Sequence, residues 1–399
     1  MLHYAIRIFQ AIAVLGCVSS CAYYLLCLAG VASFLRARNV SPDAATTAAF
    51  PPVSILKPLK GTDPEMYKSF RSHCLQDYPE YEIIFGVSDP NDPAVPNVEQ
   101  LQREFPNQVI RLVICANQLG ANIKVSNLEQ MLQTARYQHI VVNDSDIRVQ
   151  PDYLRRVMLP LADQRVGLVT CLYRGIAAAT LGSRLESLGI STDFCASVLA
   201  AHKLEGGLHF GLGSTLAFRR SDLARAGGFP GIVDHLADDY ELGRRIAALD
   251  LEVHLSDVVV ETFLPAYDLR GFLGHQLRWA RGVRDSRTAG YIGLLATFGL
   301  MWGLLTVIAA SGAWWSVGVL GVPLALRIAV ARAVGKSVLR DAQVPRFLWL
   351  LPLRDLMAVG IWLASFAGHT VSWRGEQFEL KNGRLVRSLP TPEKRLRSG

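Results

Sequence analysis

The distribution of hydrophobic positions divides the chain into apolar runs near both ends and a mixed segment between them. Residues 8–35 carry no charged side chain, and the run exceeds the roughly 20 residues that a helix needs to cross a bilayer. The pattern therefore predicts a transmembrane helix. Arg7 precedes it, and Arg36 and Arg38 follow it, which favours the C-terminal flank as the cytoplasmic one. A cleaved signal peptide is the alternative, although its apolar core of about 7–15 residues would be shorter than this run.

A second apolar run covers residues 291–331 and is interrupted only by Arg327. It is long enough for two helices, so it must contain a turn. Two places carry turn residues, Ser311-Gly312 and the segment 321–323, and either could hold it.

The third apolar run, 347–373, contains Arg354 and Asp355. Charged side chains are costly inside a bilayer unless they are paired or lie at its surface. We therefore expect 347–353 to form an interfacial helix and 356–371 to cross the membrane or re-enter it. An amphipathic helix that ends at the surface is the alternative.

The segment between these runs, residues 50–285, alternates short apolar stretches with amphipathic ones. Strand-like stretches lie at 53–56, 81–88, 109–115 and 140–142, and helix-like stretches lie between them at 64–76, 97–104 and 125–137. This alternation predicts an α/β domain, Rossmann-like, with a mostly parallel sheet and helices on both faces. Ligands of such sheets bind beyond the carboxyl ends of the strands, where Asp89 and Asp144 stand.

Composition agrees with a membrane-bound chain, since 50% of its 399 residues are hydrophobic and only 19% are charged. The net charge of +7 suits an anionic membrane surface or a phosphate-bearing substrate. Nucleic acid is not expected as a partner, because no run interleaves basic and aromatic residues. The seven cysteines form no CxxC pair and are expected to be reduced thiols in a cytoplasmic compartment. We predict four parts: a transmembrane anchor at 1–38, the α/β domain at 50–288, membrane helices at 289–376 and a basic cytoplasmic tail at 377–399.

The first candidate for chemistry is Asp144-Ser145-Asp146, directly after the strand at 140–142. Two carboxylates at positions i and i+2 can converge on one hard cation, and Mg²⁺ or Mn²⁺ held there can bridge a diphosphate. A solvated turn is the alternative. The place at the carboxyl edge of the sheet favours a divalent cation site with Asp144 and Asp146 as ligands.

A second acidic pair, Asp238-Asp239, precedes Tyr240. A carboxylate beside an acceptor hydroxyl can remove its proton while the oxygen attacks. The alternative is an acidic pair at a helix N-terminus that complements the helix dipole.

A basic segment begins at His275 and continues through Arg278, Trp279 and Arg281. On a helix, Arg278 and Arg281 share a face, and their guanidinium groups could clamp a diphosphate through paired hydrogen bonds. The alternative is a basic helix beside the membrane that binds anionic headgroups.

A glycine-rich segment at 205–214 permits close backbone approach to a ligand. Ser214 and Thr215 could offer hydroxyls to a sugar. A hairpin loop is an equally compatible alternative, and His209 fits a surface or packed histidine better than a metal ligand.

Taken in order, these features resemble the ceramide glucosyltransferase family of inverting lipid glycosyltransferases. The resemblance runs from about Val53 to Trp373 and rests on an ordered set of motifs: VSILKPLKGTDP at 53–64, DYPEYEIIFGVSDPNDPA at 77–94, ANIKVSNL at 121–128, DSDIRV at 144–149, VGLV at 166–169, Gly-Ser at 213–214, DDY at 238–240, RW at 278–279 and TVSWR at 370–374. The resemblance implies a GT-A fold, a UDP-sugar donor and a lipid acceptor in the bilayer.

Carried over by position, the family motifs assign roles to individual residues. The nucleotide-binding set implied by the resemblance comprises Asp89 or Asp92, Lys124, Asn127 and Asp144. Asp239 takes the position of the general base, with Asp238 beside it. Arg278 and Trp279 fit the family's RW motif, whereas His275 stands where the family has arginine or glutamine. Acceptor or leaving-group contacts are expected from His275, Arg281, Ser214 and Asp238.

The residues within the motifs narrow the resemblance to one branch of the family. Animal ceramide enzymes have Asp-Ser-Gly where this chain has a second aspartate, Asp146. DSDIRVQPDYLRR, HLADDYELG and HQLRWAR look more like the bacterial branch associated with hopanoid biosynthesis. That branch is thought to attach N-acetylglucosamine to bacteriohopanetetrol, so a hopanoid polyol is the expected acceptor, with a ceramide as the alternative. The expected location is a bacterial inner membrane, with the catalytic domain in the cytoplasm.

Two rival functions remain from the sequence. A polysaccharide synthase would favour more spanning helices and an intact Gln at the position of His275. A non-enzymatic scaffold with a degenerate transferase domain would be expected to have lost Asp144, Asp146 and Asp239.

Overall fold

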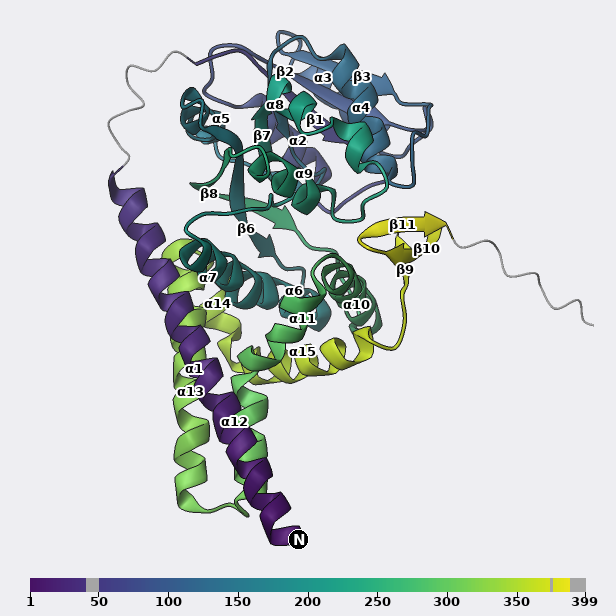
Figure 1. Ribbon diagram of the computed structural model, residues 1–399. Helices are drawn as coiled ribbons and strands as arrows, with labels where there is room; N and C mark the ends of the chain where they lie inside the picture. The colour runs from purple at the N-terminus through teal and green to yellow at the C-terminus, as the bar shows by residue number, and fades with distance from the viewer. Residues whose placement is uncertain (41–49, 374–375, 388–399) are drawn as a thin grey trace, which may run out of the picture.

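The computed structural model describes residues 1–40, 50–373 and 376–387 of the chain. An α/β domain lies at one end, a bundle of long helices extends from the other, and a layer of helices runs crosswise between them (Figure 1). The arrangement separates the α/β domain from the bundle of apolar helices.

The α/β domain is organised around one eight-stranded sheet in the order β3-β2-β1-β4-β7-β6-β8-β5. Its strands are β1 (Val53–Pro58), β2 (Tyr81–Val87), β3 (Val109–Ile114), β4 (His139–Val142), β5 (Ile147–Arg148), β6 (Val166–Ile176), β7 (Leu216–Arg219) and β8 (Glu252–Phe263). Strands β1 to β4 are parallel, as are β6 and β8, while β7 and β5 run antiparallel to their neighbours. The mostly parallel sheet expected from the alternating pattern is confirmed.

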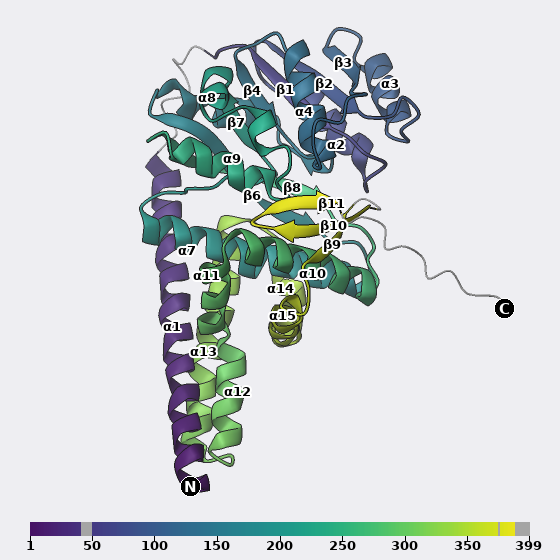
Figure 2. The ribbon, with the colours of Figure 1, turned by 45° about the vertical axis from the view of Figure 1, so that its right-hand side comes forward.

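Helices cover both faces of the sheet. They are α2 (Met66–Cys74), α3 (Val95–Glu104), α4 (Ile123–Thr134), α5 (Tyr153–Met158), α8 (Arg220–Arg225) and α9 (Asp238–Ala247). Helices α6 (Leu181–Gly189) and α7 (Cys195–Glu205) run crosswise between this domain and the bundle (Figures 1 and 2). Because side chains alternate along a strand, β1 sends Val53 and Ile55 into one core and Leu56 into the other. The first core includes Phe70 of α2, and the second includes Leu128 of α4.

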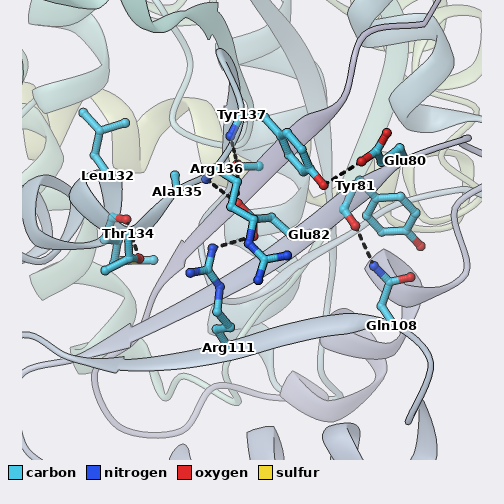
Figure 3. Close-up of polar contacts among 12 residues, drawn as sticks. Glu80, Tyr81, Glu82, Gln108, Arg111, Leu132, Thr134, Ala135, Arg136 and Tyr137 are labelled. Carbon is cyan, nitrogen blue, oxygen red and sulfur yellow. Dashed lines mark hydrogen bonds and ion pairs between the residues drawn. The ribbon is translucent and has the colours of Figure 1, made fainter.

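A buried carboxylate secures the amino-terminal edge of this sheet (Figure 3). Glu82 in β2 has no exposed surface, and it accepts hydrogen bonds from the Ser54 hydroxyl at 2.6 Å and the Arg136 backbone N–H at 2.7 Å. The Arg111 guanidinium of β3 completes the set. A buried charge is tolerated only when it is paired and hydrogen-bonded, so Glu82 joins β1, β2, β3 and the start of β4.

Three helices pack together as a bundle: α1 (Leu2–Val40), α12 (Gly299–Ala309) and α13 (Trp314–Arg332). The turn between α12 and α13 lies at Ser311-Gly312, where φ is +52° and +77°, so the first of the two candidate positions is right. The 39 residues of α1 span about 58 Å, roughly twice the hydrocarbon thickness of a bilayer. Its second half packs on α7, where Gly30 lies against the Leu199 carbonyl.

In the described part of the chain, three helices are long and apolar enough to cross a membrane: His3–Arg38, Trp314–Val338 and Gln343–Ser365. A fourth candidate is the pair Thr288–Thr297 and Gly299–Ala309, which is bent by 53°. The expectation of apolar helices near both ends is confirmed.

The crosswise layer contains α10 (Leu269–Ser286), α11 (Thr288–Gly293), α14 (Gln343–Phe347) and α15 (Leu351–Ser365). Short 3₁₀ and π turns join the helices: η2 (Leu159–Ala162), η3 (Ile190–Phe194), η4 (Phe229–Ile232), η5 (Leu294–Thr297), η6 (Ala333–Val338) and η7 (Leu348–Leu350). In Figures 1 and 2, α15 lies across the bundle, roughly perpendicular to α1. The predicted division between 347–353 and 356–371 is wrong, because α15 runs without a break from Leu351 to Ser365 and β9 begins at Thr370. Whether this helix crosses a membrane stays a prediction.

Both charges of α15 are paired. Asp355 binds the Arg327 guanidinium through two contacts of 2.8 and 3.0 Å, and Arg354 donates to the Gln276 side-chain carbonyl at 2.9 Å. These pairs explain how two charges fit within an apolar run, and they attach α15 to α13 and α10.

The end of the chain forms a second sheet, in the order β11-β10-β9. Its antiparallel strands are β9 (Thr370–Trp373), β10 (Glu376–Lys381) and β11 (Arg384–Arg387). Residues 377–387, assigned above to a basic tail, are thus folded. The alternating burial of Phe378 and Leu380 places their side chains in a small core. The remainder of the predicted tail, and Arg374 of the TVSWR motif, lie outside the described residues.

Candidate active site

The carboxyl ends of β1 and β4 meet at a cluster of charged side chains. Lys57, the fifth residue of β1, is fully buried, and its Nζ donates to the Asp144 carbonyl oxygen at 2.8 Å. Burial lowers the pKa of Lys57 to about 7, although Asp146, Asp144 and Asp63 favour its charged form. Lys57 was not identified from the sequence, and it lies directly beneath the turn that follows β4.

The Asp144-Ser145-Asp146 turn directs its polar groups to different partners. The Thr262 hydroxyl of β8 donates to Asp146, and the Ser145 hydroxyl donates to Asp63. Burial raises the pKa of Asp146 to about 6, the negative charges of Asp144 and Asp63 add to this effect, and the Thr262 hydrogen bond opposes it. Three carboxylates therefore crowd the carboxyl edge of the sheet.

Lys124 connects this turn to the acidic pair on α9. Its Nζ lies 2.8 Å from Asp144 Oδ1 and 3.1 Å from Asp238 Oδ2. Burial alone would lower the pKa of Lys124, but Asp144, Asp238 and Asp239 together raise it well above its usual range. The ammonium group is thus held in its charged form between two acidic motifs that are far apart in the sequence.

Asp239 occupies the first turn of α9, where a negative charge is favoured by the helix dipole. Its Oδ1 accepts from the Tyr240 backbone N–H at 2.8 Å. Burial and the neighbouring Asp238 raise the pKa of Asp239 to about 6, while Lys124 opposes the shift. A Cβ placed on Gly213 would lie 3.0 Å from Asp239 Oδ2 and 3.3 Å from Asp144 Oδ2, so both carboxylates point at this glycine.

The glycine-rich segment is what lets α9 approach. A Cβ atom added to Gly243 of α9 would lie 2.1 Å from the Gly211 N. A Cβ atom added to Gly211 would lie 2.9 Å from the Asp239 carbonyl oxygen. Within residues 205–214, Gly211 thus makes its close backbone approach to α9. The contact sets the distance between Asp239 and the turn after β4. The approach of this segment to a ligand stays a prediction.

Helix α10 brings the HxxRW residues to the opposite side of the cluster. The His275 ring stacks on Tyr267 with centroids 5.4 Å apart and lies 5.5 Å from the Trp279 ring. Its Nδ1 is 3.2 Å from the carboxylate of Glu186, a fully enclosed residue of α6. Burial raises the pKa of Tyr267 to about 12, with Glu186 adding to the shift and Arg278 opposing it.

The charges that act on Tyr267 also include Asp146 and Asp63. Arg278 and these two carboxylates are therefore close enough to the same phenol to influence its pKa.

Comparison with known proteins identifies the family and the fold. The model of the family described as Glycosyl transferase family 21 matches residues 12–386. The chain belongs to glycosyl transferase family 21. It is 23% identical to ceramide glucosyltransferase 1 of Caenorhabditis elegans over 97% of this chain and 83% of that protein. It is 26% identical to ceramide glucosyltransferase 3 of the same organism, over 59% of this chain and 51% of that protein.

Among solved structures, the family 21 chain is similar to the mannosyltransferase PcManGT from Pyrobaculum calidifontis, solved in complex with GDP-Man and Mn²⁺. The TM-score is 0.54 at 21% identity, over 90% of this chain and 98% of the other. This similarity confirms the GT-A fold implied by the sequence resemblance. Together with family membership, it makes the chain a glycosyltransferase with apolar helices suited to a membrane.

The predicted nucleotide-binding residues lie along one edge of the sheet in this family 21 chain. Asn127 of α4 is buried and accepts from the Ser88 hydroxyl at 2.9 Å. Asp92 accepts from the Gly61 N–H at 3.0 Å and joins the loop after β2 to the loop after β1. Asp89 is exposed and accepts from the Asn91 N–H at 2.8 Å. Their contacts with a nucleotide stay predictions.

Two predicted contacts do not fit the geometry. The Ser214 hydroxyl donates to the Cys171 carbonyl at 2.9 Å and is buried, so it faces the core and not a sugar. Arg281 Nη1 donates to the Thr370 carbonyl at 2.6 Å, which directs it toward the C-terminal sheet. One helix turn separates it from Arg278.

Three residues of the cluster were missed from the sequence: Asp63, Lys57 and Glu186. Asp63 and Lys57 both lie in the VSILKPLKGTDP motif, so a lysine and an aspartate flanking the end of a buried strand were the available signal. Glu186 carried no signal, because an acidic residue within a helical stretch is most often solvated.

The oxygen donors fit a divalent cation that is shared with a substrate. Among the described residues, no group of three or more His, Cys, Asp or Glu is preformed as a metal site. Mg²⁺ is commonly bound by one or two carboxylates together with substrate phosphates, and this arrangement needs only Asp146 and Asp144. Burial is the main cause of the raised pKa of Asp146, and the negative charges of Asp144 and Asp63 add to it.

Proposed function

We propose that this family 21 enzyme moves a sugar, N-acetylglucosamine or glucose, from a UDP-sugar to a hydroxyl of a membrane lipid, with inversion at the anomeric carbon. The observation that carries the proposal is the position of Lys124 between Asp144 and Asp238, with Asp239 directed at the same glycine as Asp144. Lys124 and Asp144, which belong to the predicted nucleotide-binding set, are thereby held a short distance from Asp239, the predicted base. Inverting transfer needs this arrangement, because donor and acceptor react at one centre.

Asp239 acts as the general base in this proposal. With a pKa of about 6 it is ionised at neutral pH and remains basic enough to take a proton from an alcohol as the C–O bond forms. The lipid oxygen attacks the anomeric carbon from the side opposite to UDP. The glycosidic bond to UDP breaks in the same displacement, and an α-linked donor yields a β-linked product.

Negative charge develops on the diphosphate of the leaving UDP as its bond to the anomeric carbon breaks. Arg278 neutralises part of it, and Trp279, which packs on His275 and Phe194, keeps the guanidinium-bearing turn of α10 in place. Asp146, assisted by Asp144, would hold Mg²⁺ or Mn²⁺, and a bound ion would supply further positive charge to the diphosphate. The fold neighbour's complex with Mn²⁺ supports this cofactor.

The crosswise helices offer a route for a lipid acceptor. Leu269 and Leu273 of α10 and Leu353 and Leu356 of α15 are between 42% and 47% exposed. Exposed apolar side chains on helices that lie across a membrane bundle suit the bilayer surface. A lipid whose polar end projects from this surface would reach the site from the side of the crosswise helices. The catalytic domain would then lie on the cytoplasmic side of the membrane.

Two acceptors have specific support. The relatives named ceramide glucosyltransferases favour a ceramide with glucose as the transferred sugar. The second aspartate of the turn, Asp146, and the motif wording favour a hopanoid polyol such as bacteriohopanetetrol with N-acetylglucosamine. Both acceptors present a primary hydroxyl on an amphiphile, which is the group that Asp239 would deprotonate.

A direct assay tests the function and separates the acceptors. The full chain in nanodiscs is incubated with UDP-glucose or UDP-N-acetylglucosamine, each with ceramide or bacteriohopanetetrol, and lipids are analysed by mass spectrometry. We expect one donor–acceptor pair to yield a lipid carrying a single sugar. A polymer would support a polysaccharide synthase, and no sugar on any lipid would refute the proposal.

The cation is tested in the same assay. Chelation by EDTA is expected to abolish transfer, and Mn²⁺ or Mg²⁺ to restore it. Asp146→Asn should bind UDP with a weakened response to Mn²⁺, measured by calorimetry. Full transfer in EDTA would exclude a metal-dependent reaction.

A further inference from the structure

The C-terminal hairpin of β10 and β11, residues 376–387, extends its tip to the segment that carries the base. Its two turn residues, Asn382 and Gly383, have φ of +51° and +77°, which suits the tight turns of two-residue hairpins. The Gly383 carbonyl accepts from Leu236 N–H at 3.1 Å, and Leu385 N–H donates to the Asp234 carbonyl at 2.7 Å. The segment 234–236 is thereby paired with β11 as a short antiparallel addition to the sheet.

An apolar contact backs these hydrogen bonds. Phe378, Leu380 and Leu385 are 1%, 2% and 4% exposed, and Leu236 and Ala121 pack against them. About 25 cal/mol is gained for each Å² of apolar surface removed from water, so these side chains make the docking favourable.

The docked segment in turn joins the two halves of the site. Its Val233 carbonyl accepts from Asn122 N–H at 2.8 Å, and its His235 carbonyl accepts from the Asn122 side-chain amide at 2.8 Å. Asn122 is the N-cap of α4, two residues before Lys124. The other end of the segment leads directly into Asp239 on α9.

The hairpin is also fastened to α10, which carries Arg278. The Asp285 carboxylate accepts from Gly383 N–H. Arg281 and Arg284 donate to the carbonyls of Thr370 at 2.6 Å and Gly368 at 2.8 Å, in the chain that leads to the hairpin. The hairpin therefore contacts the carrier of the base and the carrier of the leaving-group arginine.

We propose that the hairpin 376–387 is a positioning element for the transfer reaction: by pairing with 234–236 and binding α10, it holds Asp239 in register with Lys124 and Arg278. The inference rests on the proposed function. It assigns a role to a part of the chain that lies about 140 residues beyond the base and contributes no group to the reacting atoms.

Neighbouring residues of β11 provide a matched test. Leu385→Ser removes the buried contact, Leu385→Met keeps it, and Val386→Ser alters a side chain that is 41% exposed. We expect Leu385→Ser to lower kcat at least tenfold with the KM for UDP-sugar within about twofold. The pH at which kcat falls on the acid side should move from near 6 toward the ordinary pKa of a carboxyl group, because Asp239 becomes less buried. Leu385→Met and Val386→Ser should match the wild type in kcat and in the pH dependence of kcat.

Hydrogen exchange gives a readout that needs no turnover. Amides of residues 233–239 should exchange faster in Leu385→Ser than in wild type, with unchanged exchange in β1 and β2. If Leu385→Ser does not fold, Asp285→Asn is measured instead, since it removes only the carboxylate that holds the tip. An active wild type whose folded variants keep their kcat, pH limb and exchange rates would overturn the inference. A wild type without transfer would overturn the proposed function and leave the exchange comparison to decide the docking.

Discussion

The replacement Asp239→Asn tests the assignment of the base most directly. Asparagine keeps the shape of the side chain and can still accept the Tyr240 N–H, so the first turn of α9 should be preserved. It cannot take a proton. General bases contribute about 10²–10⁴-fold to rate, and we expect kcat to fall by that factor while UDP binding stays within about threefold.

The pH dependence of kcat gives a second quantity that can be measured. A base with a pKa of about 6 is roughly nine-tenths ionised at pH 7 and one-tenth ionised at pH 5. Wild-type kcat should therefore fall about eight- to tenfold between these values. The residual activity of Asp239→Asn should show no such limb.

The sign of the stability change separates lost chemistry from lost structure. The folded-state pKa of Asp239 is raised above its ordinary value, so the folded state binds more protons than the unfolded state between about pH 4 and pH 6. Stability contributed by this group is present at low pH and is lost as pH rises through that window. At pH 7 the neutral Asn should thus melt no lower than wild type.

The assay is sugar transfer to lipid in nanodiscs, with thermal unfolding measured on the same preparations. Asp250→Asn serves as the matched control, because Asp250 is an exposed carboxylate beyond the end of α9 with φ of +60°, which asparagine tolerates. Near-normal turnover in a folded Asp239→Asn, or an unchanged pH limb, would refute the base assignment.

Three further variants probe the supports of the site. Lys124→Gln removes the cation between Asp144 and its partner on α9, so the donor KM should rise at least tenfold; an unchanged KM would separate Lys124 from donor binding. Glu82→Ala leaves buried donors unpaired and should cost about 3–5 kcal/mol in thermal or denaturant unfolding, with activity per folded molecule retained because it lies at the edge opposite the site. Arg327→Met alone should reduce the yield of folded protein, and adding Asp355→Leu should recover most of it; a double variant worse than the single would contradict the buried pair.

Local patterns were sufficient for much of the architecture. The β-branched stretch at 140–142 predicted a buried strand, and the charge-free run at 8–35 predicted a long apolar helix; the structure has both. The acidic turn after β4 was recognisable because a strand end is where a parallel sheet presents side chains to ligands.

Other features depended on partners that are remote in sequence. Whether Ser214 faces a sugar or the core depends on the Cys171 carbonyl of β6, 43 residues away. Whether Arg281 faces the diphosphate depends on the Thr370 carbonyl, which is 89 residues away. Both are choices between hydrogen-bond partners, and a side chain's own neighbours do not decide them.

The sequence by itself determined the kinds of elements, their order and the acidic and basic motifs, because hydrophobic period, strand ends and charge runs are local properties of the chain. Only the tertiary structure decided that Lys124 lies between two acidic motifs, that α15 lies across the bundle, and that residues 376–387 fold against the segment before Asp239. Each of these outcomes depends on burying apolar surface and pairing charges between segments far apart in the chain, and that free energy exists only once the segments are in contact.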